Sequence, residues 1–318
     1  MLNIAVLDDF QDAARRHGPW SRLDADANVQ VFTDNVTGHA LVERLLSFDV
    51  AVAIRERTLF RAPLLARLPN LRMIATTGMR NLGIDVAECR RRGIAVSGTE
   101  AVGAPAAELS FALILALARN IVAEDRSLRA GTWETRHIGS TLRGRTLGLL
   151  GLGKLGTEVA AMGRAFGMDP IAWSPNLTPE RAAAGGARLV DKHTLFATAD
   201  YLSIHLVLSD RSRGIVGAPE IASMQPTACL VNTSRAGLVD EVALVAALHD
   251  GKLRGAGLDV FEQEPLPLDA PILAAPNTVL TPHLGYATAE NYAVYFPQVV
   301  DAIEAWTRGT PIRLLAHD

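Results

Sequence analysis

The sequence predicts an α/β protein built from two doubly wound parallel sheets, and three observations carry this prediction. Short apolar runs alternate with segments of helical pattern along nearly the whole chain, as in βαβ units. The runs are apolar throughout and do not alternate with polar residues, which is typical of strands covered on both faces. The chain has 318 residues, and a prior of about 150 residues per domain indicates two domains.

Residues 1–99 are predicted to form the first α/β unit. Its expected strands are 4–7, 29–32, 50–54, 73–76 and 94–96. Helical patterns at 38–46 and 86–92 lie between strands of this set. Strands that alternate with helices in this way form parallel sheets, because each return needs a crossover.

Residues 100–285 are predicted to form the second unit, which a long helical stretch at 104–130 connects to the first. Its expected strands are 147–150, 171–173, 201–204, 230–232, 257–260 and 279–280, with helical patterns at 154–166 and 241–248. A last helix, 288–308, follows the final strand. The apolar run 109–118 is shorter than the roughly 20 residues that span a bilayer, so we expect a buried helix.

Composition excludes several classes of protein. Lys and Arg number 31 against 34 Asp and Glu, so neither nucleic acid nor a membrane is expected as a partner. The two cysteines, Cys89 and Cys229, lie outside any CxxC pattern, and no two histidines have metal-ligand spacing, which predicts no metal site and no disulfide framework. The N-terminus lacks the pattern of a signal peptide, and we expect a cytoplasmic protein.

A glycine-rich turn follows the predicted strand 147–150 and opens the predicted helix 154–166. It reads Gly151-x-Gly153-x-x-Gly156. In this context Gly151 allows a tight turn, Gly153 lets the backbone approach a pyrophosphate, and Gly156 permits close helix–strand packing. The helix N-terminus offers N–H groups to phosphates. The turn therefore predicts a Rossmann-like dinucleotide site, with a ligand-free glycine turn as the alternative.

The second strand of such a unit should end with an acid that binds the ribose 2′-hydroxyl. Here residues 171–173 are followed by Ser174, Pro175 and Asn176. Asp169 precedes the strand and is at the wrong end. The neutral turn permits NAD or NADP, and we expect NAD(H) with only a slight preference.

Three later segments place polar groups in apolar surroundings. Arg235 follows the apolar strand 230–232, where open sheets bind ligands, and a guanidinium suits a carboxylate. His283 lies between Pro282 and Gly285 and is a candidate acid/base. A carboxylate in the third segment, 257–265, could fix the histidine tautomer. Taken singly, a surface arginine and a structural histidine are the alternatives.

Four motifs occur in order along the chain: Gly151-x-Gly153-x-x-Gly156, Asn232-Thr233-Ser234-Arg235-Ala236-Gly237, Asp259-Val260-Phe261-x-x-Glu264-Pro265 and Pro282-His283-Leu284-Gly285. Together they resemble the D-isomer-specific 2-hydroxyacid dehydrogenase family over essentially the whole chain. The resemblance implies two Rossmann-like domains with the active site in the cleft between them. Residues 100–285 would bind NAD(P), and 286–318 would return to the substrate domain formed by 1–99.

The resemblance also implies residue roles. Arg235 would bind the substrate carboxylate, His283 would be the acid/base, and Glu264 would pair with it. Asp259 would lie near the nicotinamide amide. Further cofactor contacts would come from Lys154, Leu155, Ser174, His205, Val207, Thr233, Ser234 and Gly285. Val207 stands where the family usually has proline.

A loop in the first unit, 76–85, matches the family's substrate loop, in which Gly78 and Met79 would offer backbone N–H groups. Arg80 replaces the family's usual second glycine. We expect Arg80, with Arg55 or Arg57, to meet a second anionic or polar group of the substrate. The alternative is that the earlier arginines pair with acids and Arg80 points to solvent.

The sequence thus predicts an enzyme that transfers hydride between a nicotinamide and a 2-oxo acid or D-2-hydroxy acid. Tyr286, where a small residue is common, would close the substrate side opposite Arg80. The family's habit suggests a homodimer. Alternatives are a non-enzymatic NAD(H)-sensing protein of the same fold and a dehydrogenase of formate or phosphite. Which 2-hydroxy acid reacts, and in which direction, stays open.

Overall fold

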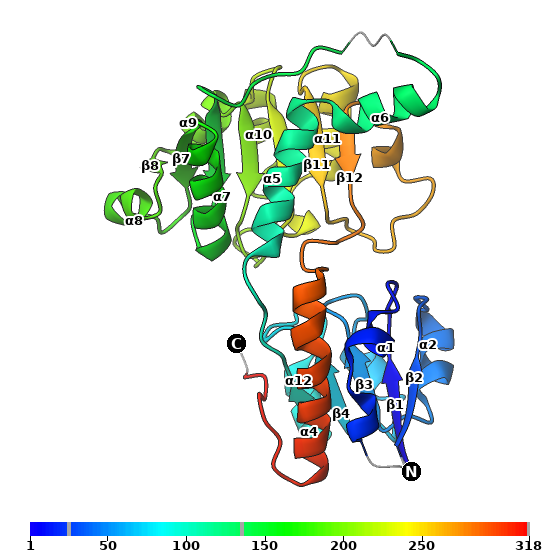
Figure 1. Cartoon of the computed structure of the whole chain (residues 1–318). Helices are drawn as coiled ribbons and strands as arrows, with labels where there is room; N and C mark the ends of the chain where they lie inside the picture. The colour runs from blue at the N-terminus through cyan, green and yellow to red at the C-terminus, as the bar shows by residue number, and fades with distance from the viewer. Residues whose placement is uncertain (24–26, 134–136, 317–318) are drawn as a thin grey trace. The chain divides into compact units, whose positions relative to one another are not determined.

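The chain divides into two compact units, each with its own parallel sheet (Figure 1). The computed structural model describes residues 1–23, 27–133 and 137–316. The first unit is Met1–Gly103 with Ala287–Asp318, and the second is Ala104–Tyr286. The boundaries expected from the sequence were 99/100 and 285/286, and residues 317 and 318 of that last segment lie outside the described residues. The predicted fold class is confirmed.

The first unit contains a five-stranded sheet in the order β2-β1-β3-β4-β5, with every neighbouring pair parallel. Its strands are β1 (Leu2–Val6), β2 (Ala27–Val31), β3 (Val50–Ala53), β4 (Met73–Thr76) and β5 (Ala95–Ser97). The central strands β3 and β4 are buried at every residue. The edge strand β2 alternates between half-buried and exposed residues, as expected for a strand with one wet face.

Helices cover both faces of this sheet. They are α1 (Ala13–His17), α2 (Gly38–Leu45), α3 (Ala62–Leu65), α4 (Val86–Arg91) and α12 (Ala289–Thr307). A core of Ala51, Ala53 and Ile74 joins residues of α2, α3 and α4. The C-terminal helix α12 packs beside α1 and against β4 and β5, so the end of the chain completes a unit that the N-terminus begins.

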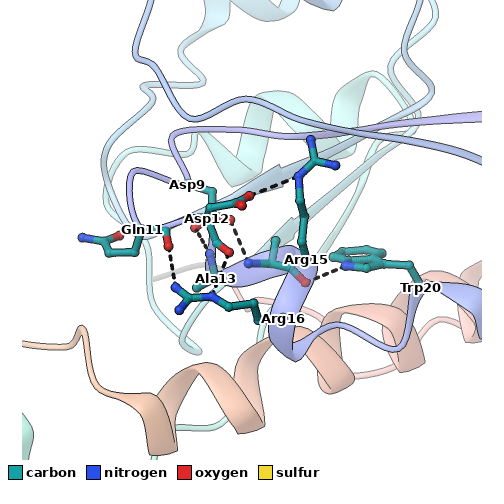
Figure 2. Close-up of polar contacts among 8 residues, drawn as sticks. Asp9, Gln11, Asp12, Ala13, Arg15, Arg16 and Trp20 are labelled. Atoms are coloured by element: carbon teal, nitrogen blue, oxygen red, sulfur yellow. Dashed lines mark hydrogen bonds and ion pairs between the residues drawn. The ribbon is translucent and has the colours of Figure 1, made fainter.

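The loop after β1 is fixed by the carboxylate of Asp9 (Figure 2). This carboxylate accepts hydrogen bonds from the backbone N–H groups of Ala13 at 3.0 Å and Ala14 at 2.7 Å. It thereby satisfies donors at the start of α1 that the helix leaves unpaired. The Trp20 indole donates to the Ala14 carbonyl oxygen at 2.7 Å. The short helix therefore depends on contacts outside itself.

The second unit contains a seven-stranded parallel sheet in the order β12-β11-β10-β9-β6-β7-β8. Its strands are β6 (Thr146–Leu150), β7 (Asp169–Trp173), β8 (Arg188–Leu189), β9 (Tyr201–Ile204), β10 (Cys229–Asn232), β11 (Gly255–Leu258) and β12 (Thr278–Leu280). The order reverses at β6, with β7 on one side and β9 on the other. Such a switch point is where open sheets bind ligands.

The helices of this unit lie on both faces of the sheet. They are α5 (Pro105–Ala118), α6 (Ile121–Arg129), α7 (Lys154–Ala165), α8 (Pro179–Ala184), α9 (Lys192–Thr198), α10 (Ala218–Ser223) and α11 (Glu241–His249). Successive residues of β6 belong to different hydrophobic cores, one on each face of the sheet. Leu149 packs with residues of α5 and α7, and Leu150 packs with residues of α9, α10 and α11. This is the two-residue period of a strand buried on both faces.

The single helical stretch predicted at 104–130 is wrong, because the chain bends by 61° between α5 and α6. Asn120 has φ of 53°, a left-handed conformation that asparagine tolerates better than most residues. The predicted strand 257–260 lies two residues too late, since β11 is Gly255–Leu258. No single helix in the described residues is long and apolar enough to cross a membrane, although α5 and α6 together pass that test by length and composition.

Candidate active site

The predicted site residues of the second unit follow the carboxyl ends of parallel strands, so they share one edge of the sheet. The glycine turn follows β6, Ser174 follows β7, and His205 follows β9. Arg235 comes after β10, and Asp259 directly follows β11. His283 lies three residues beyond β12. Parallel topology therefore gathers residues that lie more than 100 positions apart in the sequence.

The turn between β6 and α7 has the close approaches that its glycines predict. Gly151 has φ of +102°, and a Cβ atom there would lie 2.9 Å from the carbonyl of His205. At Gly156 a Cβ atom would lie 2.3 Å from the Gly151 oxygen. At Gly153 a Cβ atom would have no described atom within 4 Å. Helix and strand are thus packed tightly behind a backbone that a pyrophosphate can reach.

Lys154 and Leu155 open α7 directly after Gly153, at the N-terminal end where the helix dipole favours anions. The residues at this turn therefore fit a dinucleotide. The N–H groups and the dipole at the start of α7 supply a positive potential for phosphates.

The loop after β10 is held by the side chain of Asn232, which is 1% exposed. Its amide donates to the carbonyl oxygen of Arg235 at 2.9 Å, and its oxygen accepts from the N–H of Ser234 at 3.0 Å. The Ser234 hydroxyl donates to the Leu206 carbonyl oxygen at 2.6 Å. One side chain thereby fixes the backbone that presents Arg235, and Ser234 joins this loop to the one after β9.

Thr233, in the same loop, is buried and hydrogen bonded to Ser110 of α5, with 2.5 Å between the hydroxyl oxygens. The Arg235 guanidinium donates to the carbonyl oxygen of Ser234 at 2.6 Å. This contact directs part of the guanidinium toward its own backbone.

Asp259 is fully buried and organises the loop that carries the histidine. Its carboxylate accepts from the Thr281 hydroxyl at 2.6 Å, the Leu284 N–H at 2.7 Å and the Gly285 N–H at 2.8 Å. Burial raises the pKa of Asp259, and these three donors oppose that rise. A Cβ atom at Gly285 would lie 3.1 Å from the Asp259 carboxylate, so a larger residue here would require the carboxylate to shift.

His283 and Glu264 form a hydrogen-bonded pair. The distance between His283 Nδ1 and Glu264 Oε2 is 2.7 Å, and the other carboxylate oxygen accepts from the Phe261 N–H at 2.9 Å. Both side chains are largely covered, at 16% and 29% exposure. Because Nδ1 faces the carboxylate, Nε2 is the nitrogen that can exchange a proton with a substrate.

The backbone at His283 has φ of 54°, which costs energy for a residue other than glycine and persists where the surroundings enforce it. Asp259 supplies that enforcement by bonding the next two N–H groups. Tyr286 packs edge-on against the His283 ring, with 5.9 Å between ring centroids. The sequence did not predict this contact.

His205 lies after β9, and its ring shares a hydrogen bond with the Ser203 hydroxyl at 2.9 Å. Burial lowers the pKa of His205 to about 4. The ring is therefore neutral at pH 7, which suits packing beside a ligand better than acid/base chemistry. Val207, two residues on, is exposed.

Two loops of the first unit carry its predicted substrate residues. Gly78 has φ of +89°, and a Cβ atom there would lie 2.3 Å from a guanidinium nitrogen of Arg55. The Gly78 N–H donates to the Thr99 hydroxyl at 2.8 Å. Arg55 itself has φ of 53°. Met79 and Arg80 follow on the exposed part of the loop.

Asn81 connects these two loops of the first unit. Its amide donates to the Arg55 carbonyl oxygen at 2.6 Å and to the Thr76 hydroxyl at 2.8 Å. Arg57 lies toward the loop after β1, where it donates to the Asp8 carbonyl oxygen at 2.6 Å and stacks over the Phe10 ring at 4.5 Å. Of the two earlier arginines, Arg55 is thus the one beside Gly78.

Sequence reasoning missed the supporting residues of both units. They are Asn81, Thr99, Ser110, Ser203 and Thr281. Each is a small polar residue, and the partners of Thr99, Ser110 and Thr281 lie in distant segments of the chain. Only Thr281, directly before Pro282, carried a local signal. Among the described residues, no group of three or more His, Cys, Asp or Glu side chains could hold a metal ion.

Comparison with known proteins gives consistent matches. The profile of the family described as "D-isomer specific 2-hydroxyacid dehydrogenase, NAD binding domain" matches residues 111–285. D-3-phosphoglycerate dehydrogenase of Methanocaldococcus jannaschii is 36% identical over 312 residues, which are 97% of this chain and 58% of that protein. Glyoxylate reductase of Thermococcus litoralis is 38% identical over 259 residues, 79% of this chain and 78% of that enzyme.

Among solved structures, a phosphoglycerate oxidoreductase from Vibrio cholerae superposes with a TM-score of 0.92 at 39% identity. The match covers 97% of this chain and 100% of that one. The chain spans about half the length of the curated phosphoglycerate dehydrogenases that it matches.

Proposed function

The chain belongs to the D-isomer specific 2-hydroxyacid dehydrogenase family, and from this premise we propose that it is an NAD(P)-dependent reductase of 2-oxo acids that forms D-2-hydroxy acids. The observation that carries the proposal is the pair formed by His283 and Glu264, with 2.7 Å between Nδ1 and Oε2. The pair lies at the carboxyl ends of the strands of the second sheet, as do Arg235 and the glycine turn. A nucleotide-binding protein without chemistry needs the turn but not this pair.

The residues act on the substrate through charge and proton position. Arg235 holds the substrate carboxylate and stabilises negative charge as it develops on the carbonyl oxygen. Nε2 of protonated His283 donates a proton to that oxygen, while Glu264 stabilises the imidazolium through Nδ1. In the oxidative direction neutral His283 accepts the proton from the hydroxyl group.

The nicotinamide cofactor, when bound, supplies or accepts the hydride at the 2-carbon. Gly151, Gly153 and Gly156 leave its phosphates access to the N–H groups of α7. Asp259 would bind near the nicotinamide amide, and Thr233 and Ser234 would line the cofactor. Asp259 also holds the Leu284 and Gly285 N–H groups, so one carboxylate serves both the cofactor and the histidine loop.

We propose that the first unit sets which 2-oxo acid reacts. Its loop 76–85 carries the exposed Arg80, and Arg55 lies against Gly78 in the same unit. Two guanidinium groups on neighbouring loops favour a substrate with a second anionic or strongly polar group. Tyr286 would limit the substrate's bulk beside His283.

Arg80→Ala tests this part of the proposal. We expect the ratio of kcat/KM for a dicarboxylic to a monocarboxylic 2-oxo acid to fall by about tenfold, the worth of one charge-assisted contact. Arg90→Ala, an exposed arginine at the far end of α4, is the matched control. An unchanged ratio in Arg80→Ala would remove Arg80 from the substrate site.

The protein is further proposed to act as a homodimer. Helix α5 buries its apolar side in its own unit, whereas Ile121 and Leu128 of α6, together with Trp133 and Ile138, are exposed. A second copy of the chain would cover these residues. Light scattering should give twice the 34.0 kDa chain mass, and Leu128→Glu should halve it. A wild-type mass of a single chain would contradict the dimer.

The experiment that tests the activity is the loss of absorbance at about 340 nm with NADH and NADPH in parallel. The 2-oxo acids would be glyoxylate, hydroxypyruvate, pyruvate, phenylpyruvate and 2-oxoglutarate. We expect turnover with at least one of them, and a loss of roughly 10²–10⁴-fold in His283→Ala with nucleotide affinity retained. Nucleotide binding without any turnover would instead favour a sensor of the same fold.

A further inference from the structure

The turn after β7 carries no carboxylate at the place where this fold meets the adenosine ribose. An acid at the end of the second strand normally accepts hydrogen bonds from the ribose 2′-hydroxyl and repels a 2′-phosphate. In this chain Trp173 ends β7, and Ser174, Pro175 and Asn176 follow. The glycine turn after β6 is the neighbouring loop on the same edge, because β6 and β7 are paired.

The backbone of this turn is closed by a hydrogen bond from the Leu177 N–H to the Ser174 carbonyl oxygen at 3.1 Å. Pro175 occupies the second position of the turn, where its fixed φ is favourable. Ser174 is half-buried, while Asn176 is exposed. The turn thus presents a hydroxyl and an amide on a backbone that the proline stiffens.

A cation lies on this turn. Arg181 of α8 donates from its guanidinium to the Asn176 carbonyl oxygen at 3.2 Å, and its backbone N–H donates to the Thr178 hydroxyl at 3.3 Å. The guanidinium therefore lies against the backbone of the turn at Asn176, and a guanidinium has five N–H donors in all.

The two nearest acids in sequence do not replace the missing carboxylate. Asp169 begins β7, at the opposite end of the strand, and pairs with Arg188 at 3.4 Å. Glu180 lies in the first turn of α8, where hydrogen bonds from its own backbone N–H and the Thr178 hydroxyl lower its pKa. Its carboxylate is thereby occupied at the start of α8.

We propose that this turn selects NADP(H) over NAD(H), with Arg181 and Ser174 as the residues that bind the ribose 2′-phosphate. The inference rests on the proposed function, since it assumes that the glycine turn binds a nicotinamide dinucleotide. It reverses the slight preference for NAD(H) expected from the sequence. The reason is charge. A 2′-phosphate could accept hydrogen bonds from a guanidinium and from neutral donors at this turn, whereas the turn has no carboxylate to accept a hydrogen bond from a 2′-hydroxyl.

The test is the dissociation constant of each oxidised nucleotide without substrate, measured by titration calorimetry on the full-length chain. We expect NADP⁺ to bind about tenfold more tightly than NAD⁺, as one charge-assisted contact contributes. Raising the salt from 50 mM to 500 mM should weaken NADP⁺ binding more than NAD⁺ binding, because an exposed ion pair is screened. No turnover is needed for this readout.

Two substitutions assign the preference to the turn. Arg181→Ala should weaken NADP⁺ binding by about five- to tenfold and leave NAD⁺ binding within about twofold. Ser174→Asp should reverse the preference by restoring the acid. Arg188→Ala, which removes the same charge from the neighbouring strand β8, is the matched control and should change neither constant.

Any of three results would overturn the inference. If NAD⁺ bound as tightly as NADP⁺, the inference would be refuted. The same holds if Arg181→Ala weakened the binding of both nucleotides equally. Neither result would contradict the proposed reductase activity. Failure of both nucleotides to bind would refute the proposed function and this inference together.

Discussion

Replacing Glu264 with glutamine removes one charge from the centre of the proposed mechanism while keeping the side chain's shape. Glu264 Oε2 lies 2.7 Å from His283 Nδ1, and Oε1 accepts from the Phe261 N–H at 2.9 Å. A glutamine can keep the Phe261 contact with its oxygen, which turns its NH₂ group toward Nδ1. The proton-donating imidazolium then loses an anionic partner and meets a second donor.

The size of the effect follows from that contact. Hydrogen bonds to charged groups contribute about 1.5–3 kcal/mol, which corresponds to roughly a 10- to 150-fold loss of kcat for reduction at pH 7. The dissociation constant of the nucleotide should stay within about twofold.

The assay is steady-state reduction of the best 2-oxo acid between pH 5.5 and 8.5, with nucleotide binding measured separately. Glu262→Gln, two residues away and exposed, controls for charge lost from the same loop and should match wild type. If Glu264→Gln kept kcat within twofold of wild type across this range, the His283–Glu264 pair would have no part in proton transfer.

Three further predictions concern residues near the carboxyl ends of the strands in the second unit. Gly156→Ala should abolish nucleotide binding and lower the melting temperature, since its Cβ atom would lie 2.3 Å from the Gly151 oxygen; unchanged nucleotide affinity in a calorimetric titration would contradict it. Thr233→Val should cost about 1 kcal/mol of stability in urea unfolding, because the buried Ser110 hydroxyl loses its hydrogen bond to Thr233 at 2.5 Å and keeps only the one to the Ala106 carbonyl oxygen; a free energy of unfolding equal to wild type would refute this. Burial lowers the pKa of His205 to about 4 in the folded chain, whereas an unfolded histidine has a pKa of about 6.5. As the pH falls from about 6.5 to 4, the unfolded chain therefore binds a proton on His205 before the folded chain does. The free energy of unfolding should fall with it, by about 2–3 kcal/mol at pH 4.5. His205→Asn should remove that part of the pH dependence, and equal acid sensitivity of variant and wild type would contradict the assignment.

The sequence was sufficient for the fold class because both sheets are parallel and buried. Strands such as β3, β4 and β9 are covered at every residue, and their unbroken apolar runs are therefore visible without a partner. The glycine turn was equally readable, since Gly151 and Gly156 are required by backbone contacts within about 60 residues. At these places the residues and the contacts that require them lie close together in the sequence.

The rest could not be read in this way because its causes are long-range. The bend at Asn120 depends on one residue's φ, and nothing in the helical pattern of 104–130 requires it. The hydroxyl pair of Ser110 and Thr233 joins residues 123 positions apart. Likewise the contact between Arg181 and Asn176 is a side-chain orientation, which sequence spacing permits but does not specify.

The most direct measurement of the central claim is the fate of deuterium from a reduced nicotinamide that carries deuterium at both C4 positions. Reduction of a 2-oxo acid by this chain should place one deuterium at C2 of a 2-hydroxy acid of D configuration, as read by NMR and chiral chromatography. His283→Ala should slow this transfer by roughly 10²–10⁴-fold. A product without deuterium at C2, or one of L configuration, would contradict the account.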